Sequence, residues 1–162
     1  MDLQHSHTIV QPPGNAGLAS RIRGLRIRAG KSPAEMTQLL GLNLAWYADL
    51  EQRDDELVST LTLFQALHLA SILGIPMRDL MGEAADPDQR IALMELPDRI
   101  VAHAKRNGLT IEQFEDSVGW ELRDFLKSPV RIAAELPIAF LQAIAAALGI
   151  NWLSLVPDEG ET

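Results

Sequence analysis

Cysteine is absent from the 162-residue sequence, which excludes a disulfide framework, a thiolate nucleophile and a cysteine-based zinc site. Long hydrophobic runs are absent too. No apolar stretch approaches the roughly 18 residues of a membrane span, and no signal-peptide pattern opens the chain. We therefore expect a cytoplasmic protein with no membrane partner.

Motifs typical of enzymes are also missing. The chain has no G-x-G-x-x-G, no phosphate-binding loop, no G-x-S-x-G elbow and no histidine-carboxylate cluster at ligand spacing. His5 and His7 form half of a metal site at most, and a flexible tail is the better interpretation because no other ligands lie near them. We expect no catalysis, no metal ion and no cofactor.

Basic residues are the minority among the charged residues, with 14 lysines and arginines against 22 acids and a net charge of −8. A DNA-binding domain usually carries a basic footprint, so this balance counts against nucleic-acid binding. Residues 21–31, however, contain five basic residues and no acid, namely Arg21, Arg23, Arg26, Arg28 and Lys31. Any phosphate-binding surface is therefore a patch and not a whole face.

Residues 32–53 predict two short helices joined by a tight turn. Ser32 followed three residues later by Glu35 is a capping box, and Asn43 is suited to cap the second helix. Gly41 permits the left-handed conformation that lets the chain turn between them. The inward side chains at helical spacing are Met36, Leu39 and Leu40, then Leu44, Tyr47 and Leu50. A helix-turn-helix of this kind inserts its second helix into a DNA major groove.

Residues 21–82 contain three segments in order, RIRGLRIRAGKSPAEM, LLGLNLAWYADLEQR and LASILGIPMRDLMG. Together they resemble the Cro and lambda-repressor-like (Xre) family of helix-turn-helix domains, and the last segment is similar to the family's closing LAxxLGIPxxxL signature. The resemblance implies a compact bundle of five short helices and, usually, sequence-specific DNA binding by transcriptional regulators. It also implies that Arg26 and Glu51 form a structural ion pair.

The first part of the chain recurs in the second part. Six residues recur 78 positions later: Arg21, Ile22, Arg28, Gly30, Gly41 and Leu44 return as Arg99, Ile100, Arg106, Gly108, Gly119 and Leu122. Thr110 and Gln113 form a second capping box in the place of the first. Five residues recur 75 positions later: Ala70, Leu73, Gly74, Ile75 and Leu80 return as Ala145, Leu148, Gly149, Ile150 and Leu155. A spacing kept on both sides of one three-residue deletion indicates a duplicated domain.

We therefore predict an all-α fold of two tandem lambda-repressor-like five-helix bundles joined by a short linker helix. The expected segments are a flexible N-terminal arm (1–14), a first Xre-type domain (15–82), a linker with a short helix at 89–95 (83–96), a second, divergent domain (97–156) and a polar tail (157–162). Further helices of the first domain are expected at 16–29, 60–73 and 77–81. The acidic segment 53–60 is expected to be a loop, in which Asp54, Asp55 and Glu56 form a solvated turn rather than a cation site.

Candidate DNA contacts in the first domain are Arg21, Arg23, Arg28, Lys31, Asn43, Ala45, Trp46 and Arg53. The arginines of the first helix are either phosphate contacts or a solvated face. The positions that match the family's base-reading residues are Pro33, Leu44, Ala45 and Asp49, and none is a good base reader. Asn43 suits an adenine edge and Ala45 a thymine methyl, whereas Asp49 would repel phosphate. Trp46 suits packing or a partner contact better than base reading.

In the second domain, Arg123 and Lys127 lie four residues apart on one helical face, a spacing suited to guanine or phosphate contact. The framework ion pair is lost there, because Ala104 and Pro129 stand where the arginine and glutamate are expected. Two acidic neighbours, Glu121 and Asp124, dilute the positive charge. Each domain therefore has part of what DNA recognition needs.

These patterns favour a sequence-specific transcriptional regulator of the Xre type. Its two domains would contact successive major-groove faces of double-stranded DNA, in one arrangement as a homodimer on a longer operator. The alternative is a protein-interaction adaptor that keeps the helix-turn-helix fold as a scaffold. Such an adaptor would dock on RNA polymerase, another regulator or a toxin through its acidic surface and Trp46.

Overall fold

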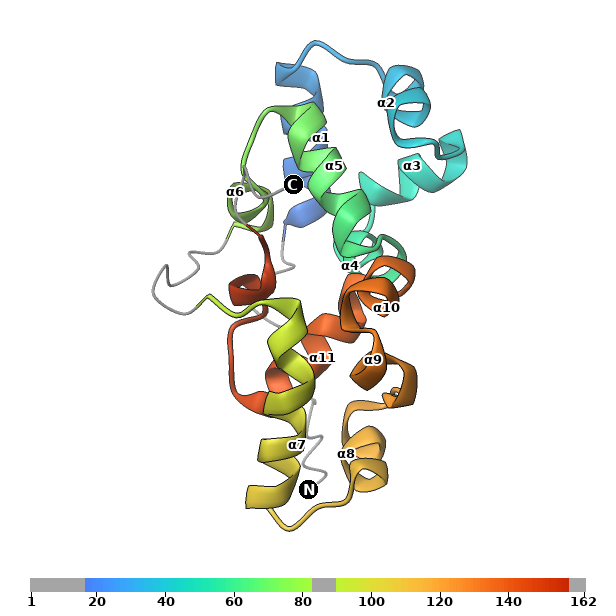
Figure 1. The fold of residues 1–162 in the computed structure, drawn as a ribbon. Helices are drawn as coiled ribbons and strands as arrows, with labels where there is room; N and C mark the ends of the chain where they lie inside the picture. The colour runs from blue at the N-terminus through green and yellow to red at the C-terminus, as the bar shows by residue number, and fades with distance from the viewer. Residues whose placement is uncertain (1–16, 83–89, 158–162) are drawn as a thin grey trace, which may run out of the picture.

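The computed structural model describes residues 17–82 and 90–157, and every regular element in these ranges is a helix (Figure 1). This confirms the predicted all-α class. None of the helices in these ranges is long and apolar enough to cross a bilayer. Three expected segments lie wholly or partly outside the described residues. They are the N-terminal arm with His5 and His7, residues 83–89 of the linker and residues 158–162 of the polar tail.

We call residues 17–82 the N-terminal half and residues 90–157 the C-terminal half. The N-terminal half contains α1 (Leu18–Arg28), α2 (Pro33–Leu40), α3 (Leu44–Leu50), α4 (Glu56–Thr60), α5 (Leu63–Leu73) and α6 (Met77–Met81). The C-terminal half contains the 3₁₀ helix η1 (Leu93–Glu95), α7 (Leu96–Arg106), α8 (Ile111–Val118), α9 (Arg123–Lys127), α10 (Pro129–Glu135), α11 (Ile138–Leu148) and the 3₁₀ helix η2 (Trp152–Leu155). Within the described part of the predicted linker helix, only η1 forms.

Capping side chains fix where several helices begin. Ser32 and Glu35 exchange hydrogen bonds at the start of α2, and Thr110 and Gln113 do the same at the start of α8, as the sequence predicts. A third capping box, made by Thr62 and Gln65, starts α5. The helix predicted at 60–73 therefore begins at Leu63, because Leu61 and Thr62 are extended and separate α5 from α4, which ends at Thr60.

The acidic segment after α3 is a helix and not the expected loop. Leu57 and Val58 of α4 are buried, and Glu56 beside them is buried as well. Glu56 forms an ion pair with the exposed Arg53. Two apolar residues, preceded by three acids and followed by Ser59 and Thr60, give too short a pattern to reveal a one-turn helix, so burial in the tertiary structure decides the conformation here.

Asp54 caps the start of α1 and is therefore not simply part of a solvated turn, as expected. Its Oδ2 accepts a hydrogen bond from the backbone N–H of Gly17 at 2.9 Å, and its Oδ1 accepts one from Ala19 at 3.0 Å. These are unpaired donors of the first turn of α1, whose own residues supply no side-chain cap. A carboxylate at this end also interacts favourably with the helix dipole.

The order and lengths of the helices in the N-terminal half recur in the C-terminal half. The helices α1 and α7 each have 11 residues, α2 and α8 each have 8, and α5 and α11 each have 11. The lengths differ between α2 and α5, where α3 has 7 residues and α4 has 5, whereas the corresponding α9 has 5 and α10 has 7. The three-residue deletion read from the sequence falls in this region.

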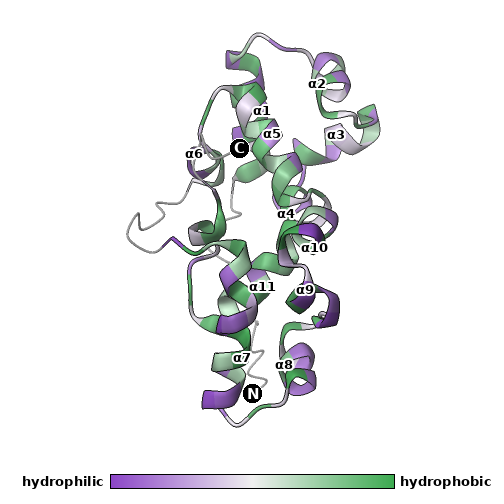
Figure 2. Ribbon diagram, in the orientation of Figure 1, coloured by the Kyte–Doolittle hydropathy of each residue, from purple (hydrophilic) through white to green (hydrophobic). Residues whose placement is uncertain are grey.

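The two halves share one hydrophobic core. The helix α4 packs against α11, and α10 packs against α5. A β-bridge joins Thr62 to Pro137 in antiparallel fashion, and the backbone N–H of Ile138 donates to the carbonyl oxygen of Leu61 at 2.9 Å. Apolar residues follow α5 and α11 through the middle of the molecule, whereas polar residues cover the outer surfaces of α8 and α9 (Figure 2). Apolar packing and backbone hydrogen bonding therefore join the two halves at this junction.

The cap on α1 gives a stability prediction. Replacing Asp54 by Ala removes two accepted hydrogen bonds, and we expect the free energy of unfolding to fall by about 1 kcal/mol. Urea unfolding of the purified variant measures the change. Asp55→Ala is the matched control, because no side-chain hydrogen bond of Asp55 caps the helix beside it, α4. Equal losses in both variants would contradict the assigned cap.

Candidate nucleic-acid interface

The helices α2 and α3, here called the first helix pair, form a rigid corner. Gly41 adopts a left-handed conformation, with φ 68°, and ends α2. The side-chain Oδ1 of Asn43 then accepts a hydrogen bond from the backbone N–H of Trp46 at 2.8 Å and caps α3. The turn needs only residues 41–43, so the orientation of α3 relative to α2 is set by local chemistry.

A partly buried ion pair ties the first helix pair to α1. Arg26 Nε lies 2.5 Å from Glu51 Oε1, and Arg26 Nη2 lies 3.1 Å from Glu51 Oε2, a two-pronged contact. Arg26 Nη1 also donates to the carbonyl oxygen of Lys31 at 2.9 Å. Tyr47, whose ring is fully buried, donates a hydrogen bond from its hydroxyl group to Glu51 Oε1 at 2.8 Å. The network joins α1, the following turn and α3.

This network shifts the protonation of its members. Burial raises the pKa of Glu51, but hydrogen bonds from Arg26 and Tyr47 and the arginine charge outweigh it and hold the pKa below 4.5. Burial, followed by the hydrogen bond to Glu51, raises the pKa of the Tyr47 hydroxyl. The hydrogen bond to Glu51 raises the pKa of Arg26. Glu51 is therefore ionised and Tyr47 is neutral at physiological pH.

The basic residues of α1 divide into two groups. Arg23 and Arg28 are exposed on the helix surface. Arg21 instead donates from Nη1 to the carbonyl oxygen of Leu80 at 2.8 Å, and its guanidinium covers Gly82 so closely that a Cβ there would lie 2.6 Å from it. Arg21 thus closes the end of α6, and Arg23 and Arg28 are better placed for a phosphate. Lys31 is partly exposed at the turn before α2.

The remaining candidates on the first helix pair differ in accessibility. Ala45 is exposed, and Leu44 beside it is 57% exposed, which corrects its expected place in the core. Leu39 is 46% exposed and is likewise not a core residue. Trp46 is half-buried and donates from Nε1 to Thr60 Oγ1 at 3.1 Å, so its indole anchors α3 on α4. The outer surface of α3 is apolar at its start.

The helices α8 and α9, the second helix pair, reach a similar corner with different chemistry. Gly119 has φ 75° and ends α8, and Glu115 Oε1 accepts a hydrogen bond from the backbone N–H of Leu122 at 2.7 Å. Within residues 90–157, no polar network corresponds to that of Arg26, Glu51 and Tyr47. Phe125, at the position of Tyr47 in the repeat, meets Phe140 edge-on at 5.0 Å between ring centres. Ala104, where the arginine is lost, is buried.

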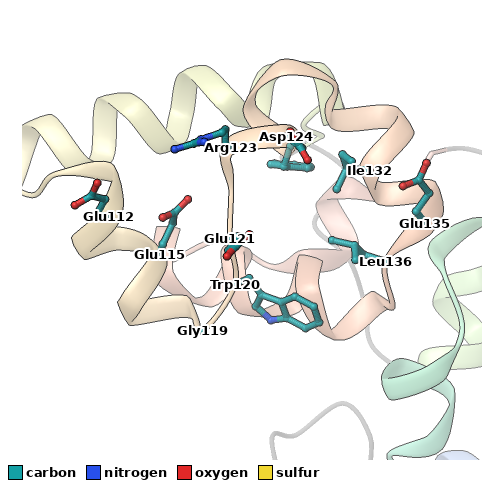
Figure 3. A pocket seen from close by; sticks show the side chains of 11 residues that line it. Glu112, Glu115, Gly119, Trp120, Glu121, Arg123, Asp124, Ile132, Glu135 and Leu136 are labelled. Carbon is teal, nitrogen blue, oxygen red and sulfur yellow. The ribbon is translucent and has the colours of Figure 1, made fainter.

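The second helix pair borders an acidic cleft of about 720 Å³ (Figure 3). Five of its lining side chains are carboxylates: Glu112, Glu115, Glu121, Asp124 and Glu135. Arg123 points across the cleft toward Glu112 and Glu115 (Figure 3), and the ring of Trp120 lies at its floor against Phe140. Lys127 is exposed on the same helix as Arg123 but does not line the cleft. The surrounding carboxylates offset the positive charge of Arg123.

Glu121 and Asp124 were recognisable in the sequence as acidic neighbours of Arg123, but the cleft was not, because Glu112 and Glu115 come from α8 and Glu135 comes from α10. The spacing of Glu112 and Glu115, three residues apart in a helix, was the available signal that they share a face. Among the described residues, no group of three or more histidine, cysteine or carboxylate side chains is placed to hold a metal ion.

Comparison of the chain with protein-family models, with curated proteins and with solved structures gives no match. The assignment of a function therefore depends on the residues and their geometry.

The ion-pair network gives a prediction with a pH dependence. Glu51→Gln removes the charge that Arg26 faces, and we expect the free energy of unfolding at pH 7 to fall by about 2 kcal/mol. Because the folded-state pKa is lowered, this stabilisation is fully present above the ordinary value of 4.5 and is lost as the pH falls through the lower folded-state value. Chemical unfolding of both proteins between pH 7 and pH 3 measures the difference.

Glu135→Gln is the matched control, since Glu135 pairs with Arg131 at 3.2 Å on an exposed surface. We expect little change in that variant. A Glu51→Gln effect that stays constant down to pH 3 would show that charge is not its source.

Proposed function

We propose that the protein is a sequence-specific DNA-binding regulator of the Xre type, in which two related helix-turn-helix bundles stand in one chain. The observation that carries the proposal is the first helix pair, held rigidly by the Arg26–Glu51 network beside a helix whose charged residues are all basic. A helix-turn-helix of this construction presents its second helix to a major groove. Arg23, Arg28 and Lys31 then lie beside it for the phosphates.

The proposed base contacts are few. Leu44 and Ala45 are exposed at the start of α3 and suit thymine methyl groups. Asn43 uses its side-chain oxygen to cap α3, so only its amide nitrogen is offered to a base as a donor. Arg53 is exposed beyond α3 and suits a phosphate, although it already pairs with Glu56. Such a surface would favour sites rich in A·T pairs.

The acidic cleft favours a second candidate function. A protein adaptor that binds a basic segment would use the carboxylates around Trp120, and the net charge of −8 agrees with a cationic partner. Trp46 is a weaker candidate for the partner contact than its sequence position indicates, because it already bonds to Thr60. DNA binding remains the preferred proposal because it also accounts for the basic surface of α1.

The proposal predicts that a shared sequence is enriched when the purified chain selects fragments of genomic DNA. The best duplex should bind about a thousandfold more tightly than random DNA. Its affinity should fall steeply between two salt concentrations, because phosphate contacts release counterions. Failure to enrich any sequence, with weak binding that vanishes at physiological salt, would remove the proposal and favour the adaptor.

The arginines of α1 provide the corresponding variants. Arg23→Ala and Arg28→Ala should each weaken binding to the selected duplex by roughly threefold to tenfold and lower the salt slope by about 0.9. Arg99→Ala, on α7, is the matched control, because Arg99 lies 4.0 Å from Glu95 and away from the first helix pair. Equal effects of all three changes would indicate a general loss of charge instead of defined contacts.

A further inference from the structure

The contact between the two halves is made by residues that correspond to each other in the repeat. Thr62 is the residue that precedes α5, and Pro137 is the residue that precedes α11. They are 75 positions apart, which is the spacing of the repeat in this region, and they pair directly as an antiparallel bridge. A residue that pairs antiparallel with its own counterpart lies close to a local two-fold axis.

The helices around this bridge pack reciprocally. The helices α4 and α10 correspond in the repeat, and so do α5 and α11. The helix α4 packs on α11, and its counterpart α10 packs on α5, so both contacts required by a two-fold relation are present. Leu61 and Ile138, on either side of the bridge, are fully buried. A simple translation from one half to the next would not bring these pairs together.

This relation has a consequence for the two helix pairs. The pairs α2–α3 and α8–α9 lie along the same edge of the molecule, one toward each end (Figure 1). Two helix pairs related by a two-fold axis contact a DNA duplex in opposite orientations along its length. Protein two-fold symmetry is mirrored in the palindromy of a DNA site, and the half-sites of a helix-turn-helix dimer lie about one helical turn apart.

We propose that one chain binds one duplex at two inverted half-sites, as an intramolecular counterpart of a two-fold dimer; this inference rests on the proposed DNA-binding function. The order of the repeat along the chain would by itself suggest half-sites in direct repeat. The packing selects the inverted order, because a direct arrangement would separate α4 from α11 and expose Leu61 and Ile138. No second copy of the chain is needed.

The two half-sites contribute unequally. The N-terminal half offers Arg23, Arg28 and Lys31 around its helix pair. The C-terminal half offers Arg123 and Lys127, and Arg123 lies among the carboxylates of the acidic cleft. Base changes in the half-site of the N-terminal half should therefore weaken binding more than the same changes in the other half-site.

A disulfide across the junction tests the arrangement. Facing residues of an antiparallel pair have Cα atoms about 4.5–5.5 Å apart, within the range that a disulfide spans. The chain has no cysteine, so the double variant T62C/P137C has only one possible intramolecular disulfide. Binding of the oxidised protein to the selected duplex is compared with that of the reduced protein and of the two single variants, with the number of chains per duplex measured by sedimentation.

We expect the oxidised protein to bind one duplex as one chain, with an affinity within about threefold of the reduced protein. If the reduced protein binds the duplex and oxidation weakens its affinity by tenfold or more, the inference is overturned while the proposed function stays intact. Two chains on each duplex would overturn it as well. If neither form nor the unmodified chain binds any selected DNA, the proposed function itself fails.

The unmodified chain provides a second test, which does not depend on how the variant folds. Duplexes that carry the two selected half-sites in inverted order and in direct order, at the same spacing, are titrated in parallel. We expect the inverted duplex to bind at least tenfold more tightly. Equal affinities, or a preference for the direct order, would contradict the two-fold arrangement.

Discussion

The junction at Thr62 and Pro137 is the constraint on which the arrangement of the whole molecule depends. Backbone pairing there brings α4 onto α11 and α10 onto α5. Leu61 and Ile138 are thereby removed from water, and burial of apolar side chains of this size contributes roughly 1.5–3 kcal/mol each. The junction leaves α2, α3, α8 and α9 on the edge of the molecule, so the geometry of the candidate interface follows from a contact remote from it.

Each half holds its helix pair with a different set of interactions. In the N-terminal half, Arg26, Glu51 and Tyr47 form a charged network whose members satisfy one another. In the C-terminal half, Phe125 replaces the tyrosine and packs against Phe140, while the charged partners are absent. The arginine and the glutamate are replaced together, and this is expected because an arginine buried without its carboxylate would strongly destabilise the fold. A helix corner of the same form is thus compatible with a polar or an apolar support.

Local signals in the sequence were sufficient for the starts of α2, α3 and α8 and for the turn between α2 and α3. Ser32 with Glu35, and Thr110 with Gln113, act within four residues, and Gly41 acts on its own backbone. Such interactions are legible from spacing alone. The repeat offsets were equally apparent in the sequence, and the order of helices in the C-terminal half follows that of the N-terminal half.

Long-range contacts could not be predicted in the same way. Asp54 caps a helix 35–37 residues earlier in the chain, and nothing in the acidic segment distinguishes it from its neighbour Asp55. In the sequence Arg21 is indistinguishable from Arg23 and Arg28. The structure shows that its guanidinium donates a hydrogen bond to the carbonyl oxygen of Leu80 in α6. The candidate site was therefore predictable as a set of helices, whereas the division of its basic residues into structural and accessible groups required the tertiary structure.

Amide hydrogen exchange of the full chain, with and without a selected duplex, tests most directly whether one DNA molecule lies along the edge formed by both helix pairs. Binding should slow exchange in residues 33–50 and, to a smaller extent, in residues 111–127. Residues 77–81 and 152–155, which form the last helical segment of each half, should exchange as before. Slower exchange confined to those end segments, or to the second helix pair alone, would contradict the account.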